Sequence, residues 1–303
     1  MFLVLALLLQ QIVSTVPVQR GQRLEVSAYA GEIDVKTWDR AAVRVQADPD
    51  QRTRVEIERT GASVTVRTEG RRGAARMVDM TITVPAWMPL DVSGVYTNVT
   101  VVGAKGPVNI ETVQGEVSVD GGDGLVTLQS VQGSVELKNA KGRLEVHSVN
   151  EGVTVSNSSG EVTAETVNGD VTLEKVNATS VSATSVNGEM LYDGTIKDGG
   201  RYGFSTHNGD ITVTVPQNSN AAVSVSTFNG EFASEFPVTL TETRKGKRFS
   251  FRLGTGSAQM TLESFQGSIE LVRPGSTRSA REHDSDRDDH DHDRDRDHDE
   301  DWE

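Results

Sequence analysis

The sequence of 303 residues contains no cysteine. A disulfide framework and a lipid-modified N-terminal cysteine are therefore both excluded, and stability must come from the repeat itself. Aromatic residues account for only 5% of the chain and apolar residues for 35%. This is little material for a conventional globular core. It suits thin stacked units whose interior is filled by Val, Leu, Ile and Ala.

Positive charge is also scarce, since 30 Lys and Arg stand against 44 Asp and Glu and the net charge is -14. Residues 281–303 alone hold thirteen acidic residues and four arginines, a balance of -9, which leaves about -5 for the rest. The acidity is thus concentrated in the C-terminal tail. A nucleic-acid partner is not expected, because binding phosphate backbones requires Lys and Arg gathered on one face.

The chain has no apolar run long enough to cross a bilayer, which takes about 20 residues. The run from Phe2 to Leu9 instead has the position and length of the apolar core of a secretory signal, although no Lys or Arg precedes it. We predict a signal peptide in residues 1–19, either cleaved or retained as an anchor, and no membrane span in the mature chain. The protein is then exported to the periplasm, the cell surface or the medium.

A short motif of an apolar residue, an amide residue and glycine recurs along the chain. Its amide positions are separated by 18, 18, 18, 19, 21, 21 and 37 residues. These positions are Gln114, Gln132, Asn150, Asn168, Asn187, Asn208, Asn229 and Gln266. A fixed period near 20 residues is typical of stacked identical units and indicates a solenoid.

From Gly106 to Leu173 each repeat divides into two half-units of nine residues. In eight consecutive half-units, the second and fourth positions after the start are apolar, as at Val108 and Ile110. Residues two apart point to the same side of a strand, so each half-unit is a short strand with two inward side chains. We predict an all-β fold, a right-handed parallel β-solenoid with about 18–21 residues per coil.

The recurring motif is interpreted as a corner of each coil. Glycine would take a positive φ and turn the chain, and the eight amide side chains would hydrogen-bond to one another along the axis as a structural ladder. The motif valines would fill the interior at this corner, and smaller residues would fill the opposite one. The valines are Val113, Val131, Val149 and Val167; the opposite residues are Gly122, Ala140, Ser158 and Val176.

The two ends of the chain depart from this pattern. Residues 20–90 alternate in period two but lack the motif, so they are predicted to form a β-rich N-terminal cap before a repeat domain in residues 91–273. Strands at Ala258 to Leu262 and Ser268 to Leu271 are expected to close the fold. Residues 274–303 contain too little apolar surface to offset their ordering entropy, and are predicted to be a disordered acidic tail.

The order of several short segments is distinctive over about 250 residues. They are Gly31 to Ile33 with Trp38-Asp39, Val84-Pro85, Asn168 to Asp170, Asn208 to Ile211 and Val215-Pro216. In this order the chain resembles, from about Leu24 to Val272, the bacterial DUF4097 family of candidate adhesins with β-strand repeats. The resemblance implies a β-solenoid exposed at the cell envelope, with some relatives linked to envelope stress. It carries over no catalytic residues, and the acidic tail departs from it.

Few residues suggest chemistry. Four tail histidines among aspartates are weak candidates for exchangeable binding of Zn, Ni or Cu, the alternative being a solvating acidic tail. These histidines are His283, His290, His292 and His298. Outward carboxylates such as Glu116, Asp170 and Asp210 repeat beside the glycine, which spreads them along an edge, whereas catalysis needs two in one pocket. We therefore expect no catalytic residue and no cofactor.

Aromatic residues offer the best place to look for a binding surface. Tyr192, Tyr202, Phe204 and Phe228 cluster near the lengthened repeats, although Phe204 and Phe228 are expected to fill the interior. The sequence thus predicts a non-enzymatic, monomeric scaffold or adhesin-like protein of the cell envelope, whose partners are envelope proteins or polysaccharide. The alternatives are a carbohydrate-active β-helix enzyme and a partner-binding protein in envelope-stress sensing.

Overall fold

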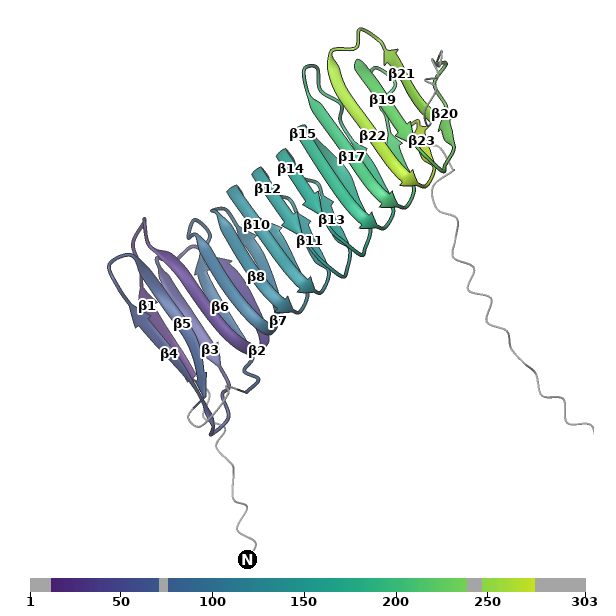
Figure 1. The fold of residues 1–303 in the computed structure, drawn as a ribbon. Coiled ribbons are helices and arrows are strands. Elements are labelled where there is room, and N and C mark those ends of the chain that lie inside the picture. Colours follow the sequence, from purple (N-terminus) through teal and green to yellow (C-terminus); the bar gives the residue numbers. More distant parts are fainter. Residues whose placement is uncertain (1–11, 71–75, 239–246, 276–303) are drawn as a thin grey trace, which may run out of the picture.

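The computed structural model describes residues 12–70, 76–238 and 247–275, and every regular element in these ranges is a β-strand (Figure 1). The first strands are β1 (Ile12–Pro17), β2 (Arg23–Trp38), β3 (Ala42–Ala47), β4 (Thr53–Arg59), β5 (Ser63–Gly70), β6 (Met80–Pro85), β7 (Leu90–Ala104) and β8 (Val108–Gln114). The middle strands are β9 (Val117–Gly121), β10 (Asp123–Gln132), β11 (Val135–Lys138), β12 (Lys141–His147), β13 (Val153–Ser156), β14 (Ser159–Glu165), β15 (Val171–Asn187) and β16 (Met190–Gly194). The last are β17 (Arg201–Asn208), β18 (Ile211–Thr214), β19 (Ala221–Thr227), β20 (Phe232–Ser234), β21 (Lys247–Leu253), β22 (Ala258–Gln266) and β23 (Ile269–Val272). The all-β prediction is confirmed.

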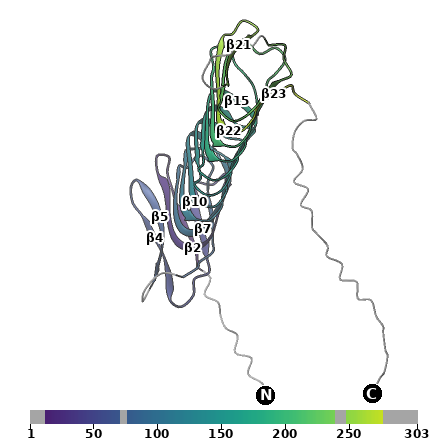
Figure 2. The ribbon, with the colours of Figure 1, turned by 45° about the vertical axis from the view of Figure 1, so that its right-hand side comes forward.

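Equivalent strands of successive repeats pair in parallel. Val126 in β10 lies beside Val108 in β8 and Leu144 in β12. The second half of each repeat forms another row, in which Val135 of β11 lies beside Val117 of β9. Each repeat thus contributes one strand segment to each of two rows, and we call this pair of segments a layer. Figures 1 and 2 show the layers stacked along one axis.

The interior between the two rows is filled by the residues that the nine-residue pattern selects. All sixteen inward positions from Val108 to Leu173 are buried. The opposite corner is buried as well, from Gly122 to Val176. Period-two alternation decides this result, because a strand with one covered face must place alternate side chains inside.

The order of the layers in space differs from their order in the chain. β22 pairs in parallel with β17 on one side and β19 on the other, and β23 lies likewise between β18 and β20. The layer expected to close the fold is therefore inserted before one that precedes it in sequence. The step of 37 residues between Asn229 and Gln266 reflects this detour. Among the described strands, β21 is the last of the row that contains β8, β10 and β12, and it runs antiparallel to β19.

Side-chain hydrogen bonds fasten the inserted layer to its neighbours. Asp198 accepts hydrogen bonds from the hydroxyl of Ser257 and from Asn220 Nδ2, the latter at 3.2 Å. Asn220 Oδ1 in turn accepts from the Thr255 amide at 3.0 Å. The hydrogen bond from the Ser257 hydroxyl, and to a smaller extent the one from Asn220, holds the pKa of Asp198 below its usual range. The turn before β22 is thus tied to turns that lie far away in sequence.

Parallel pairing begins before residue 91. β2 pairs in parallel with β7 on one side and with β5 and β6 on the other. Antiparallel strands cover this end, since β4 pairs with β5, β3 with β6 and β1 with β3. β1 lies within the predicted signal peptide and pairs with β3 over six positions. Residues 1–11 and 276–303, the latter with the four tail histidines, lie outside the described ranges.

Candidate functional site

The recurring motif has the opposite orientation to the one predicted. Val113, Val167 and Val186 are 50%, 40% and 41% exposed. The residue before each apolar position is buried instead, and in every copy it carries a hydroxyl group. These buried residues are Thr112, Ser130, Ser148, Thr166, Ser185, Thr206, Thr227 and Ser264. The prediction that the motif valines fill the interior is therefore wrong.

Unpaired carbonyl groups at the turn explain why a hydroxyl is inside. Ser130 Oγ donates a hydrogen bond of 2.9 Å to the carbonyl oxygen of Gly115 in the neighbouring layer. Thr166 Oγ1 donates in the same way to Glu151 at 2.8 Å. Leaving such a partly buried acceptor unpaired costs up to about 1 to 3 kcal/mol, and a valine has no donor to offer. The sequence carried the signal, because Ser or Thr stands before the apolar residue in all eight copies.

The motif glycine is needed for close approach between layers more than for its dihedral angle. A positive φ occurs at Gly115 and Gly209 of the motif, not at every corner. A Cβ at Gly188, by contrast, would overlap the carbonyl oxygen of Gly169 in the adjacent layer. Gly133 is packed in the same way on Gly115. The stacking of turns on turns therefore favours a residue without a side chain, which seven of the eight copies have, Glu151 being the exception.

The predicted amide residues lie in one exposed row beside the turns. Asn168 Nδ2 donates to Asn150 Oδ1 at 3.3 Å, and Asn187 donates to Asn168 at 2.8 Å. Asn208 continues the row by donating to Asn187 at 2.7 Å. Within the described ranges, the side chains of Gln114, Gln132, Asn229 and Gln266 form no bond of this kind. The hydrogen-bonded ladder thus covers four neighbouring layers.

Two of the carboxylates after the glycine, Asp170 and Asp210, have a structural contact with the next layer. Asp170 Oδ1 accepts from the backbone amide of Glu189 at 2.7 Å, and Asp210 Oδ1 accepts from that of Ser268 at 2.7 Å. Asn98 does the same for the amide of Glu116 at 3.0 Å. These groups cap backbone donors from layer to layer. At these three positions the side chain therefore serves the stack.

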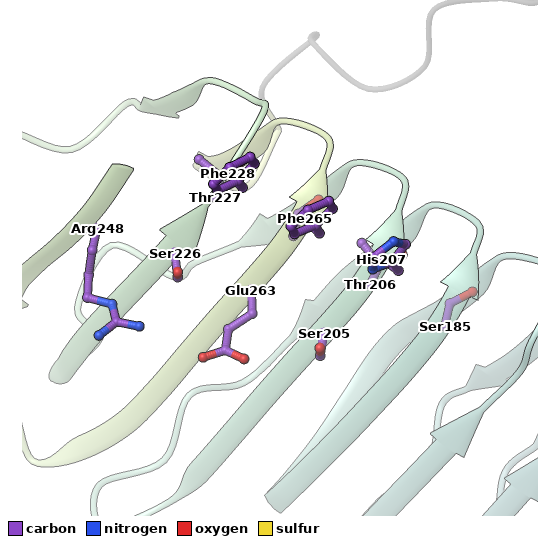
Figure 3. A pocket seen from close by; sticks show the side chains of 11 residues that line it. Ser185, Ser205, Thr206, His207, Ser226, Thr227, Phe228, Arg248, Glu263 and Phe265 are labelled. Carbon is purple, nitrogen blue, oxygen red and sulfur yellow. The ribbon is translucent and has the colours of Figure 1, made fainter. Parts of the chain in front are cut away.

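At the C-terminal end of the stack, aromatic rings replace the exposed valines. The rings of His207 and Phe265 are stacked, with centroids 4.7 Å apart and planes inclined by 5°. Those of Phe265 and Phe228 are 5.0 Å apart and inclined by 2°. We call these three residues the ring column, and Figure 3 shows them in one line across neighbouring strands. Phe228 is 59% exposed, so the prediction that it fills the interior is wrong.

The three residues that the sequence grouped with Phe228 lie inside the stack. Tyr192, Tyr202 and Phe204 are buried, with Tyr192 centred 5.1 Å from Phe204. The Tyr202 hydroxyl donates to the carbonyl of Ala178 at 2.9 Å, and burial raises the pKa of both tyrosines. Phe204 fills the interior as predicted. The two tyrosines cannot form the exposed platform for which they were considered, because their rings are enclosed.

A polar surface adjoins the ring column. We define the polar face as the outward residues of β17, β22, β19 and β21. One of its rows contains Ser205, Glu263, Ser226 and Arg248, which lie side by side in that order. With the ring column, these four residues line a shallow depression of about 420 Å³ (Figure 3). Among the described residues that line it, Glu263 is the one acidic residue.

Four described arginines have a carboxylate partner, and the arginines of the polar face do not. Arg54, for example, pairs with Glu69 at 2.8 Å, and Arg143 pairs with Glu145 at 2.7 Å. Arg201, Arg248 and Arg252 are exposed and form no ion pair with another described residue. Their charges are therefore available to a ligand.

Comparison with known proteins identifies the family. Residues 22–272 match the family described as Toastrack DUF4097. The chain belongs to the Toastrack DUF4097 family. The resemblance noted from the sequence is thereby confirmed, over nearly the same residues.

Solved structures similar to this Toastrack chain include a candidate adhesin from Bacteroides fragilis, at 12% identity and a TM-score of 0.44, covering 87% of this chain and 97% of that one. A candidate lipid-binding protein from Parabacteroides distasonis shows 9% identity and a TM-score of 0.43, covering 86% and 96%. A candidate cell adhesion protein from Clostridium sporogenes shows 9% identity and a TM-score of 0.22, covering 87% and 99%. No curated protein matches the chain.

The described part of the Toastrack chain contains neither a metal-binding cluster nor a membrane-spanning helix. Within residues 12–70, 76–238 and 247–275, no three His, Cys, Asp or Glu side chains gather as a metal site would require. The same residues include no helix of the length and apolarity that a bilayer crossing demands. The tail histidines proposed as weak metal ligands lie beyond these ranges.

Proposed function

We propose that this Toastrack chain is a non-enzymatic, adhesin-like scaffold of the cell envelope that binds envelope polysaccharide or protein through the polar face and the ring column. In this proposal the stack is a right-handed parallel β-solenoid, and the protein is exported and acts as a monomer. Solenoids of this type supply long regular surfaces for binding.

The ring column is the observation that carries the proposal. The position it occupies holds an exposed valine in other layers, as at Val113 and Val167, and those layers stack equally well. The architecture therefore does not require aromatic rings at this position. Their exposure in three successive layers is confined to the C-terminal end, beside the depression. Exposed aromatic side chains are a common mark of binding surfaces.

The chemistry of the depression supports binding over catalysis. A glycoside hydrolase uses two carboxyl groups about 5 to 10 Å apart, and the described residues that line the depression include one, Glu263. Its other polar residues are Arg248, His207 and hydroxyl side chains, including the buried Thr206 and Ser264, which already donate to backbone carbonyls. The remaining groups can hold a ligand, and among the described ones Glu263 has no second carboxylate beside it.

The proposal is tested by replacing the two phenylalanines of the ring column with valine, the residue that other layers have at this position. The double variant Phe228→Val and Phe265→Val should keep the circular dichroism spectrum and bind much less to isolated envelope material than the natural chain. The matched control is Val113→Ala with Val167→Ala, which alters the same position in other layers and should bind normally. If the natural chain and both variants bind envelope material equally, the ring column is not the binding surface. Cell fractionation checks the location, and a cytoplasmic protein would contradict the envelope role.

A further inference from the structure

We infer that the polar face binds an anionic polymer, whose carboxylate or phosphate groups are held by Arg201, Arg248 and Arg252. This inference rests on the proposed function, because it names the ligand class of the same surface. It follows from the placement of the arginines, the small hydroxyl residues between them and the orientation of the rings.

The three arginines are widely spaced around the face. Arg201 and Arg252 lie in one row of outward residues, separated by Gln259 and Ala222. Three strand spacings place their backbones roughly 14 Å apart. Arg248 and Arg252 are four residues apart on β21, or roughly 13 Å. Each guanidinium can therefore meet a different anionic group, which fits a polymer with repeated charges better than a single small anion.

The surface between the arginines consists of small and mostly polar residues. Its middle row contains Gly203, Thr261, Ser224 and Ser250, which lie side by side across the four strands. A Cβ placed on Gly203 would have its nearest neighbouring atom 4.0 Å away, so the surface there is open. Hydroxyl groups can both donate and accept hydrogen bonds, which suits the hydroxyls of a sugar chain. The backbone of a charged polymer can thus lie flat across this row.

The ring column favours negative charge over a neutral sugar. Both faces of Phe265 are covered, by His207 on one side and Phe228 on the other. A pyranose cannot stack on a covered face. Phe265 therefore presents its edge, which carries the positive part of the aromatic quadrupole and attracts anionic oxygen atoms. This edge and the three guanidinium groups therefore select the same kind of ligand.

The overall acidity of the chain does not oppose this binding strongly. Exposed charges farther away than about 8 Å are largely screened at physiological ionic strength. Among the outward residues of the four strands, Glu263 is the one acidic group against three arginines. The local balance is therefore positive although the net charge is -14.

Binding of defined polymers to the full chain tests the inference. The probes are polygalacturonate, which carries carboxylates, poly(glycerol phosphate), which carries phosphates, and neutral dextran. The variant R201Q/R248Q/R252Q removes the charges of the face. The control R52Q/R59Q/R67Q removes the same number of exposed charges from the other end, where these residues also lack an ion pair with any described residue.

We expect the natural chain to bind at least one polyanion, with no binding of dextran. Affinity should fall more than about tenfold in the face variant and less than about twofold in the control, since only the face variant loses the charge-assisted hydrogen bonds to the polymer. Binding of only one polyanion identifies carboxylate or phosphate as the source. Dextran binding as tight as that of the polyanions, equal loss in both variants, or no polyanion binding would overturn the inference.

The envelope assay separates this inference from the proposed function. Suppose that R201Q/R248Q/R252Q binds envelope material normally while the double phenylalanine variant does not. The proposed binding surface is then supported, and the inference that it binds an anionic polymer is wrong. If both variants bind normally, the proposed surface itself fails.

Discussion

The buried hydroxyl of each turn gives the sharpest test of how the layers are built. Thr166 is 4% exposed, and its Oγ1 donates to the carbonyl of Glu151 at 2.8 Å. Thr166→Val keeps the side-chain shape but removes the donor. The unpaired carbonyl costs about 1 to 3 kcal/mol, whereas the extra buried methyl group returns at most about 0.8 kcal/mol. We expect the free energy of unfolding to fall by about 1 to 2 kcal/mol.

The neighbouring position supplies the matched control. Val167 is 40% exposed and contacts water, so Val167→Thr should change the free energy of unfolding by less than about 0.5 kcal/mol. If valine filled the interior, as its sequence pattern suggested, the two results would be exchanged. Thr166→Val would then be neutral or stabilising, and Val167→Thr would be costly.

Urea unfolding of the full chain, followed by circular dichroism, measures both variants. Because a stack of repeats can open layer by layer, hydrogen exchange adds a local readout. The Thr166 amide donates to the Thr184 carbonyl at 2.9 Å, and its protection should fall in Thr166→Val alone. Unchanged stability and protection in Thr166→Val, together with a loss above about 1 kcal/mol in Val167→Thr, would refute this description of the turn.

Three further changes follow from the turns. Asn168→Leu breaks two exposed ladder hydrogen bonds and should lower unfolding stability by about 1 kcal/mol, with envelope binding unchanged; a selective loss of binding would contradict a structural ladder. Gly188→Ala forces a Cβ into a backbone carbonyl and should cost more than about 2 kcal/mol, whereas Gly61→Ala, with open space around it, should be nearly neutral in urea titrations. The lowered pKa of Asp198 means that its ionised form stabilises the fold at neutral pH, and that this contribution is lost as the pH falls below about 4. Protection of the Ala258 amide should decline over that range, and Asp198→Asn should weaken it at neutral pH and flatten the dependence; an unchanged profile would separate Asp198 from the inserted layer.

Strand positions and inward residues were predictable because both depend on local geometry. A strand alternates its side chains every residue, so apolar residues at the second and fourth positions of each half-unit indicate which side is covered. Val108, Ile110 and their equivalents could therefore be assigned without knowing what lies above or below them. The same holds for the amide row, because a constant period places equivalent residues one above another.

The turn was predicted in the wrong phase for a related reason. Period-two alternation continues into the motif, where Val162, Ala164 and Thr166 are buried in turn, so the period itself assigns Thr166 to the interior. Hydrophobicity alone favours Val167, and the prediction followed hydrophobicity. Only the carbonyl group of the neighbouring layer, which needs a donor, makes the hydroxyl the better interior residue.

By itself the sequence determined the β-strands, their inward faces, the repeat and the family, because these depend on spacing along the chain. The tertiary structure alone decided the order of the last layers, the stacking of His207, Phe265 and Phe228, and the approach of Arg201 to the strands that carry Arg248 and Arg252. These arrangements depend on β22 pairing with both β17 and β19. Such pairing joins residues up to about 60 positions apart, and no local pattern specifies which layer a distant strand will join.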